Sequence, residues 1–145
     1  MSLLDSLKKT LRGDSNQPSA PPPARPSEPD PDDFILPEID PVRLIAQIKD
    51  GDQPVILDCR EPWERKQLRI PGSLHIPMNE TPARLHELPS GQEIYVVCAH
   101  GNRSAGVSGY LLQQGFRAVN LRGGMAAWQA QGGPTESDYR PRTEA

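Results

Sequence analysis

Cys98 stands between two stretches whose apolar residues repeat with different periods. The apolar run 94–97 before it is typical of a buried strand, and residues 104–114 after it show helical periodicity. The short loop between them contains Gly101 and Arg103. Such a loop can direct several backbone N–H groups at one sulfur atom, and a helix N-terminus adds partial positive charge. Because both effects lower the pKa of a thiol, the pattern predicts that Cys98 is a nucleophilic thiolate.

The other loop residues are candidates for binding the substrate. Inward-pointing N–H groups stabilise an anionic sulfur without moving during the reaction, and Gly101 permits the tight curl that this needs. Arg103 could hold an anionic molecule that donates sulfur, or it could brace the loop. His100 could supply charge or face solvent. The alternative is a buried cysteine that only ends a strand. The candidate substrate-binding residues are Ala99, His100, Gly101, Asn102, Arg103 and Ser104.

The composition predicts one folded domain and two flexible ends. The chain has 145 residues and 17 prolines, more than half of which precede residue 42. We therefore expect residues 1–33 to be a disordered Pro-rich segment, residues 34–133 to be the domain, and residues 134–145 to be a flexible tail. Residues 3–12 carry leucines on one helical face, so they are either a frayed terminus or a short amphipathic helix that binds a protein partner or a membrane surface.

Charge and cysteine content argue against several classes of protein. The net charge is −3 and basic residues do not cluster with aromatic ones, so no nucleic-acid partner is expected. Two cysteines give neither a disulfide framework nor a zinc spacing, and His75 and His86 are scattered, so we expect no metal and no cofactor. No apolar run has the length of a transmembrane segment or a secretory signal, which predicts a cytoplasmic protein.

Short apolar runs alternate with helical patterns along the domain. Strands are predicted over residues 55–57, 74–76, 94–97 and 118–121, with 34–36 as a further edge strand. Helices are predicted from Pro41 to Gly51 with Asp40 as cap, and over residues 81–88, 104–114 and 125–131. This alternation implies an α/β fold with a parallel sheet covered on both faces. Ligands in such folds bind beyond the carboxyl ends of the strands, where Cys98 lies.

Polar residues also follow the strand over residues 55–57. Asp58, Arg60 and Glu64 could act as acid–base groups, or they could form an ion-pair network that braces the strand end near the site. Cys59 stands among them. It is either a small core residue or a second thiol that resolves a bond formed at Cys98.

Four motifs, in this order, resemble the rhodanese-like sulfurtransferases of the single-domain type. They are Asp58 to Glu64 (DCREPWE), Ile70 to Ser73 (IPGS) with Ile76-Pro77, Cys98 to Ser104 (CAHGNRS), and Leu121 to Gly124 (LRGG) with Ala127-Trp128. The resemblance covers about residues 38–131. It implies a parallel sheet of about five strands with helices on both faces, and a cysteine that cycles through a persulfide. Leu68-Arg69 and Cys59 depart from the family's usual pattern without touching the loop.

The resemblance implies sulfur transfer. The Cys98 thiolate would take sulfur from thiosulfate or a similar small anionic donor, and the persulfide would pass it to a thiol or a sulfur-carrier protein. One alternative is a sulfur-relay or regulatory module tethered to a partner protein. A lower-ranked alternative is a cysteine-dependent phosphatase or arsenate reductase, whose loops place arginine one position further from the cysteine than the five that separate Cys98 and Arg103.

Overall fold

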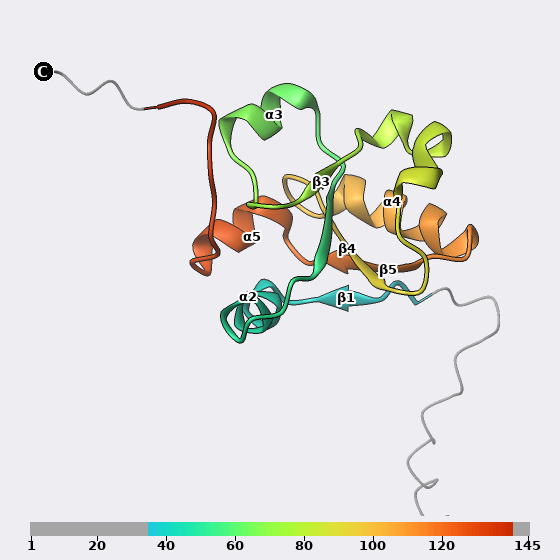
Figure 1. Cartoon of the computed structure of the whole chain (residues 1–145), viewed down its shortest axis with the longest axis horizontal. Helices are drawn as coiled ribbons and strands as arrows, with labels where there is room; N and C mark the ends of the chain where they lie inside the picture. The colour runs from blue at the N-terminus through green and yellow to red at the C-terminus, as the bar shows by residue number, and fades with distance from the viewer. Residues whose placement is uncertain (1–34, 141–145) are drawn as a thin grey trace, which may run out of the picture. The chain divides into compact units, whose positions relative to one another are not determined.

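The computed structural model of the chain describes residues 35–140. The predictions for residues 1–33 lie outside this range. Five strands form one parallel sheet in the order β1-β5-β4-β2-β3 (Figure 1), which confirms the predicted α/β fold. The strands are β1 (Glu38–Ile39), β2 (Val55–Asp58), β3 (Leu74–His75), β4 (Glu93–Val97) and β5 (Arg117–Leu121).

Helices connect the strands in the βαβ manner that a parallel sheet requires. The α-helices are α2 (Pro41–Lys49), α3 (Pro62–Gln67), α4 (Asn102–Gln113) and α5 (Gly124–Ala130), and the 3₁₀ helices are η1 (Met78–Glu80) and η2 (Pro82–Glu87). The cap predicted for α2 is present, since the Asp40 carboxylate accepts a hydrogen bond from the Val42 N–H at 3.1 Å. Within residues 35–140 no helix is long and apolar enough to cross a membrane.

Each face of the sheet has its own hydrophobic core. On one face, α4 packs against β4 and β5, and its Val107 and Leu111 share a core cluster with Leu57 of β2 and with Leu88. On the other face, α2 and α5 contribute Leu44 and Trp128. The central strands β2 and β4 are therefore buried on both sides. This explains why they are continuous apolar runs rather than alternating ones.

The structure corrects the predicted boundaries in several places. In place of the helix predicted over residues 81–88 the structure has the 3₁₀ helix η2, which is interrupted at Arg84 by a non-helical backbone (φ −121°, ψ 19°). The edge strand lies at residues 38–39 instead of 34–36, where it pairs with β5. Helix α4 begins at Asn102, two residues before the predicted start.

Helix α3 is absent from the sequence-based prediction. Its six residues are too few to show a helical period. A local signal was nevertheless present, because Glu61 and Glu64 form a capping box around Pro62 at the first helical position.

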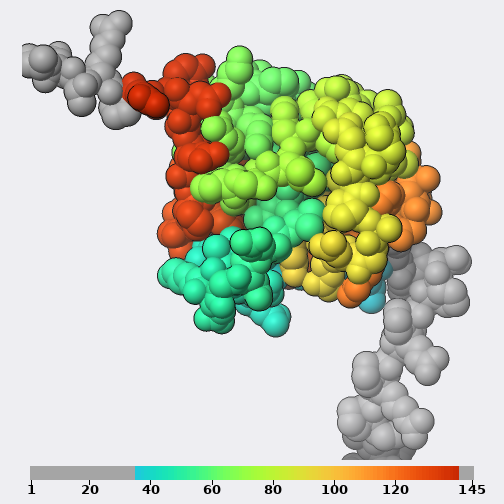
Figure 2. Space-filling model, viewed as in Figure 1, coloured from blue at the N-terminus to red at the C-terminus, as the bar shows by residue number. Residues whose placement is uncertain are grey.

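Residues 134–138, which composition assigns to a flexible tail, lie along the surface beside α3 (Figure 2). Trp128 Nε1 donates to the carbonyl of Pro134 at 2.9 Å. Arg69 and Glu136 exchange two backbone hydrogen bonds of 2.9 Å, and the Arg69 guanidinium pairs with Asp138 at 2.8 Å. Arg69 is 67 positions from Glu136, so local composition could not reveal this contact.

Candidate functional site

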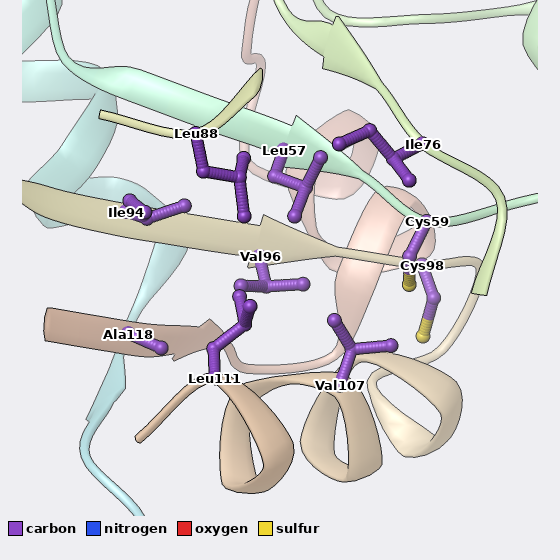
Figure 3. Packing of buried hydrophobic residues seen from close by; sticks show 10 residues of the cluster. All are labelled: Leu57, Cys59, Ile76, Leu88, Ile94, Val96, Cys98, Val107, Leu111 and Ala118. Carbon is purple, nitrogen blue, oxygen red and sulfur yellow. The ribbon is translucent and has the colours of Figure 1, made fainter. Parts of the chain in front are cut away.

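The carboxyl ends of β2 and β4 bring Asp58, Cys59 and Cys98 to one edge of the sheet. The register pairs Asp58 with Val97, and the Cys59 N–H continues the ladder by donating to the Val97 carbonyl at 3.1 Å. Figure 3 shows the sulfur atoms of Cys59 and Cys98 next to each other, on the side of the sheet that α4 covers. Both side chains are buried, each at 1 % exposure.

The loop after β4 curls around the Cys98 sulfur. The Gly101 N–H donates to Sγ at 3.0 Å, and the Ser104 hydroxyl lies 3.2 Å from Sγ. Gly101 is the N-cap of α4 and has a left-handed backbone with φ 98°. A Cβ at this position would lie 3.2 Å from the Gly123 nitrogen, so the curl requires glycine. Cys98 therefore faces amide and hydroxyl donors at the positive end of a helix.

The N-terminus of α5 holds the first peptide of the loop. The N–H of Met125 donates to the Cys98 carbonyl at 2.8 Å, and the N–H of Ala126 donates to the Ala99 carbonyl at 3.1 Å. Gly124 has φ 59°, and a Cβ there would overlap with the Cys98 carbonyl oxygen. Gly123 and Gly124 at the start of α5 thus allow this helix to approach the backbone that carries Cys98.

A buried polar chain continues from the sulfur into the core. The Ser104 hydroxyl lies 2.5 Å from Oδ1 of Asn120, whose Nδ2 donates to the Gly101 carbonyl at 3.3 Å. Because Oδ1 can only accept, the Ser104 hydroxyl donates to it when Cys98 is a neutral thiol. When Cys98 ionises, the same hydroxyl can turn to the thiolate. Asn120 lies on β5 and is absent from the sequence-based candidates.

The pKa of Cys98 is lowered by these donors. The largest cause is the Cys59 thiol, followed among the favourable ones by the Ser104 hydroxyl and the Gly101 amide, while burial opposes them. The pKa of Cys59 is raised, because its proton is hydrogen-bonded to Cys98 and its side chain is buried. The Cys59 thiol also lies 3.4 Å from the Val97 carbonyl. A thiolate is a stronger hydrogen-bond acceptor than a carbonyl. When Cys98 is ionised, we therefore expect Cys59 to keep its proton and to donate it to the Cys98 thiolate rather than to the Val97 carbonyl.

Arg103 is engaged by a carboxylate. Its two terminal nitrogens donate to the two oxygens of Glu64 at 2.6 and 2.8 Å, which joins the first turn of α4 to α3. The guanidinium lowers the pKa of Glu64, and the carboxylate raises that of Arg103. Two roles were considered for Arg103, and this ion pair with Glu64 fits the one in which Arg103 braces the loop.

Asp58 and Arg60 form a second, deeper ion pair. Asp58 Oδ1 accepts from Arg60 Nε at 3.0 Å, and Oδ2 accepts from Nη2 at 2.8 Å. Arg65 lies 3.5 Å from the same carboxylate. With side-chain exposures of 5 % for Arg60 and 1 % for Asp58, this pair is buried at the carboxyl end of β2. Both oxygens of Asp58 are occupied by arginine, which fits a structural role better than proton transfer.

A pocket of about 280 Å³ lies beside the Cys98 loop. Ala99 and His100 form one wall, α5 supplies Met125, and α3 supplies Trp63, which is 60 % exposed. Cys98 itself does not line this pocket. Residues 35–140 contain no group of three His, Cys, Asp or Glu side chains that could hold a metal ion.

The chain also matches known proteins over the region that forms this site. Residues 40–131 match the family model of the rhodanese-like domain. The chain belongs to the rhodanese-like family.

Individual relatives match this rhodanese-like domain over nearly their whole length, and a solved structure among them has a similar fold. A sulfurtransferase of Allochromatium vinosum is 39 % identical over 98 residues, which are 67 % of this chain and 92 % of the relative. The putative sulfurtransferase YtwF of Bacillus subtilis is 35 % identical over 97 residues, 67 % of this chain and 94 % of the relative. The crystal structure of a rhodanese-related protein from Thermoplasma volcanium superposes with a TM-score of 0.65 at 34 % identity, covering 70 % of this chain and 98 % of that one.

The predicted site residues of this rhodanese-like domain take different positions around Cys98. Gly101 and Ser104 contact the sulfur, Ala99 and His100 face the pocket, and Asn102 is exposed in the first turn of α4. Sequence reasoning missed Asn120, and it assigned Trp63 to packing, whereas Trp63 is 60 % exposed and lines the pocket. A buried-strand pattern interrupted by a single asparagine was the available signal for Asn120, because a buried amide needs partners.

Proposed function

We propose that this rhodanese-like domain is a sulfurtransferase that carries a sulfane sulfur as a persulfide on Cys98. The observation that supports this most is the environment of Sγ. An amide at 3.0 Å and a hydroxyl at 3.2 Å meet at a thiol whose pKa is lowered, mainly by the Cys59 thiol. The relatives named as sulfurtransferases add to this support.

The proposed reaction begins with attack of the Cys98 thiolate on the outer sulfur of thiosulfate. A bond forms between Sγ and that sulfur, the S–S bond of the donor breaks, and sulfite leaves with the electron pair. The persulfide anion then gives its outer sulfur to an acceptor, which is cyanide in an assay and a thiol or a sulfur-carrier protein in the cell. The Gly101 N–H and the Ser104 hydroxyl stabilise the anionic sulfur in both steps.

Access to Sγ requires the loop to open. Cys98 is only 1 % exposed, whereas Ala99 and His100 of the same loop line the adjacent pocket. We propose that donor and acceptor enter through this pocket and displace the loop segment around His100. Arg103 would then contribute positive charge near the entering anion while Glu64 keeps its guanidinium in place.

The test is an assay with thiosulfate and cyanide on the full chain and on Cys98→Ser, together with mass spectrometry after exposure to thiosulfate alone. One added sulfur atom on the peptide that contains Cys98, and loss of thiocyanate formation in Cys98→Ser, are expected. Turnover of an aryl phosphate in place of thiosulfate, abolished by Cys98→Ser, would instead identify a phosphatase.

A further inference from the structure

The two cysteines of the chain occupy equivalent positions on neighbouring parallel strands. The register pairs Leu57 with Val96 and Asp58 with Val97, so one further step places Cys59 opposite Cys98. Neighbouring strands lie about 4.8 Å apart. This spacing falls inside the range of about 4.4–6.8 Å between Cα atoms that a disulfide spans.

Both side chains also point to the same face of the sheet. Cys59 and Cys98 belong to the core cluster that contains Leu57 and Val96, two residues earlier on each strand. Their sulfur atoms lie side by side below the strands in Figure 3. Position and direction therefore both suit a bond between the two sulfurs.

We propose that Cys59 is a resolving cysteine, which discharges the Cys98 persulfide as hydrosulfide and forms a Cys59–Cys98 disulfide. This inference rests on the proposed function, because it needs the persulfide. It makes the protein a source of sulfide when no acceptor occupies the pocket beside the loop. It also assigns a covalent role to a residue that otherwise acts on Cys98 only by lowering its pKa.

The step balances within the protein. The Cys59 thiol gives its proton to the outer sulfur of the persulfide, and the Cys59 sulfur bonds to Sγ of Cys98. The bond between Sγ and the outer sulfur breaks, and its electron pair leaves with the sulfur as HS⁻. The sulfane sulfur gains two electrons, and the pair of cysteines loses two. A small dithiol or a dithiol protein must then reduce the disulfide before the next cycle.

The local electrostatics keep the two thiols in different states until the persulfide forms. The raised pKa of Cys59 keeps its proton in place, so Cys59 does not compete with Cys98 for the donor. The same proton is available to the leaving sulfur in the second step. A thiolate at Cys59 would lack that proton and would repel the anion at Cys98.

The experiment follows one turnover in the absence of an acceptor. The wild-type chain and Cys59→Ala are reduced, loaded anaerobically with thiosulfate and freed of excess donor, and intact mass and released sulfide are then followed over time. The wild type should first gain one sulfur atom, then lose it as one sulfide per chain, and end two hydrogen atoms lighter than the reduced protein. Peptide mapping should show a Cys59–Cys98 disulfide, which dithiothreitol reverses.

In Cys59→Ala the sulfur should load more slowly, because the Cys59 thiol contributes most to the lowered pKa of Cys98. Once added, the sulfur should persist, with complete loss of the disulfide and of sulfide release. Cys59→Val, which fills more of the same core site, should behave in the same way and covers the case that the alanine variant fails to fold. A wild-type persulfide that lasts as long as that of the variants would overturn the inference. So would a disulfide that forms equally fast in wild type never exposed to thiosulfate. Absence of any sulfur adduct on Cys98 of the wild type would instead contradict the proposed function.

Discussion

Two serines on α4 allow a matched test of the thiolate environment. Ser104 and Ser108 are both fully buried, and alanine removes the same hydroxyl from each. The Ser104 hydroxyl lies 3.2 Å from the Cys98 sulfur, whereas the Ser108 hydroxyl has no hydrogen-bond partner among residues 35–140. Ser104→Ala should therefore raise the pKa of Cys98, and Ser108→Ala should leave it unchanged.

The size of the shift follows from the hydrogen bonds that change on ionisation. A hydrogen bond to a charged group contributes about 1.5–3 kcal/mol. Part of this is offset in the wild type, because the Ser104 hydroxyl must leave Oδ1 of Asn120 when it turns to the thiolate. The lower end, about 1.5 kcal/mol, corresponds to an increase of roughly one unit in the pKa of Cys98.

The assay is the rate of alkylation of Cys98 by iodoacetamide as a function of pH, read by mass spectrometry of the Cys98 peptide. In Ser104→Ala the thiolate limb of the profile should move to higher pH by about one unit. Unfolding by urea gives a second readout. Ser104→Ala leaves the buried Asn120 oxygen without its donor, at a cost of about 1–3 kcal/mol, whereas Ser108→Ala should be close to neutral. Identical pH profiles for the two variants would refute the assigned role of Ser104.

Three further predictions follow from the contacts around the site. Glu64→Gln should lower the free energy of unfolding by about 1 kcal/mol at neutral pH. Because Arg103 lowers the pKa of Glu64, the wild-type advantage should be present above the ordinary carboxyl pKa and disappear as the pH falls through the lowered one, which urea titrations at several pH values measure. Gly124→Ala should abolish thiosulfate turnover and lower the melting temperature, because its Cβ would overlap with the Cys98 carbonyl; retained activity would contradict the proposed contact. Deletion of residues 1–33 should leave melting temperature and thiosulfate turnover unchanged, and a drop of many degrees would show that this segment packs on the domain.

Features carried by neighbouring residues could be predicted from the sequence. The change from a continuous apolar run to a helical period located Cys98 between β4 and α4, because burial on both faces of a central parallel strand leaves that signature. Asp40 with Pro41 likewise predicted the start of α2 from two residues. In each case the structural cause acts over a few positions of the chain.

Features that depend on distant partners could not be predicted in this way. Glu64 and Arg103 are separated by 39 positions, and no local pattern indicates which carboxylate an arginine will meet. The Ser104–Asn120 hydrogen bond spans 16 positions and exists only because α4 packs on β5. A local pattern can also mislead. Residues 81–88 have a helical sequence pattern, but the structure has a 3₁₀ helix there that is interrupted at Arg84, so the local preference did not decide the backbone.

The chemistry at Cys98 depends on the register of two strands as much as on the loop. Side chains alternate along a strand, so a shift of β2 by one residue would move Cys59 to the opposite face and bring Asp58 or Arg60 toward the Cys98 sulfur. The packing of Leu57 against the α4 side of the sheet opposes that shift, as does the buried Asp58–Arg60 ion pair. The core residues that hold β2 in place are thereby also the residues that hold a protonated thiol, rather than a charge, next to the proposed nucleophile.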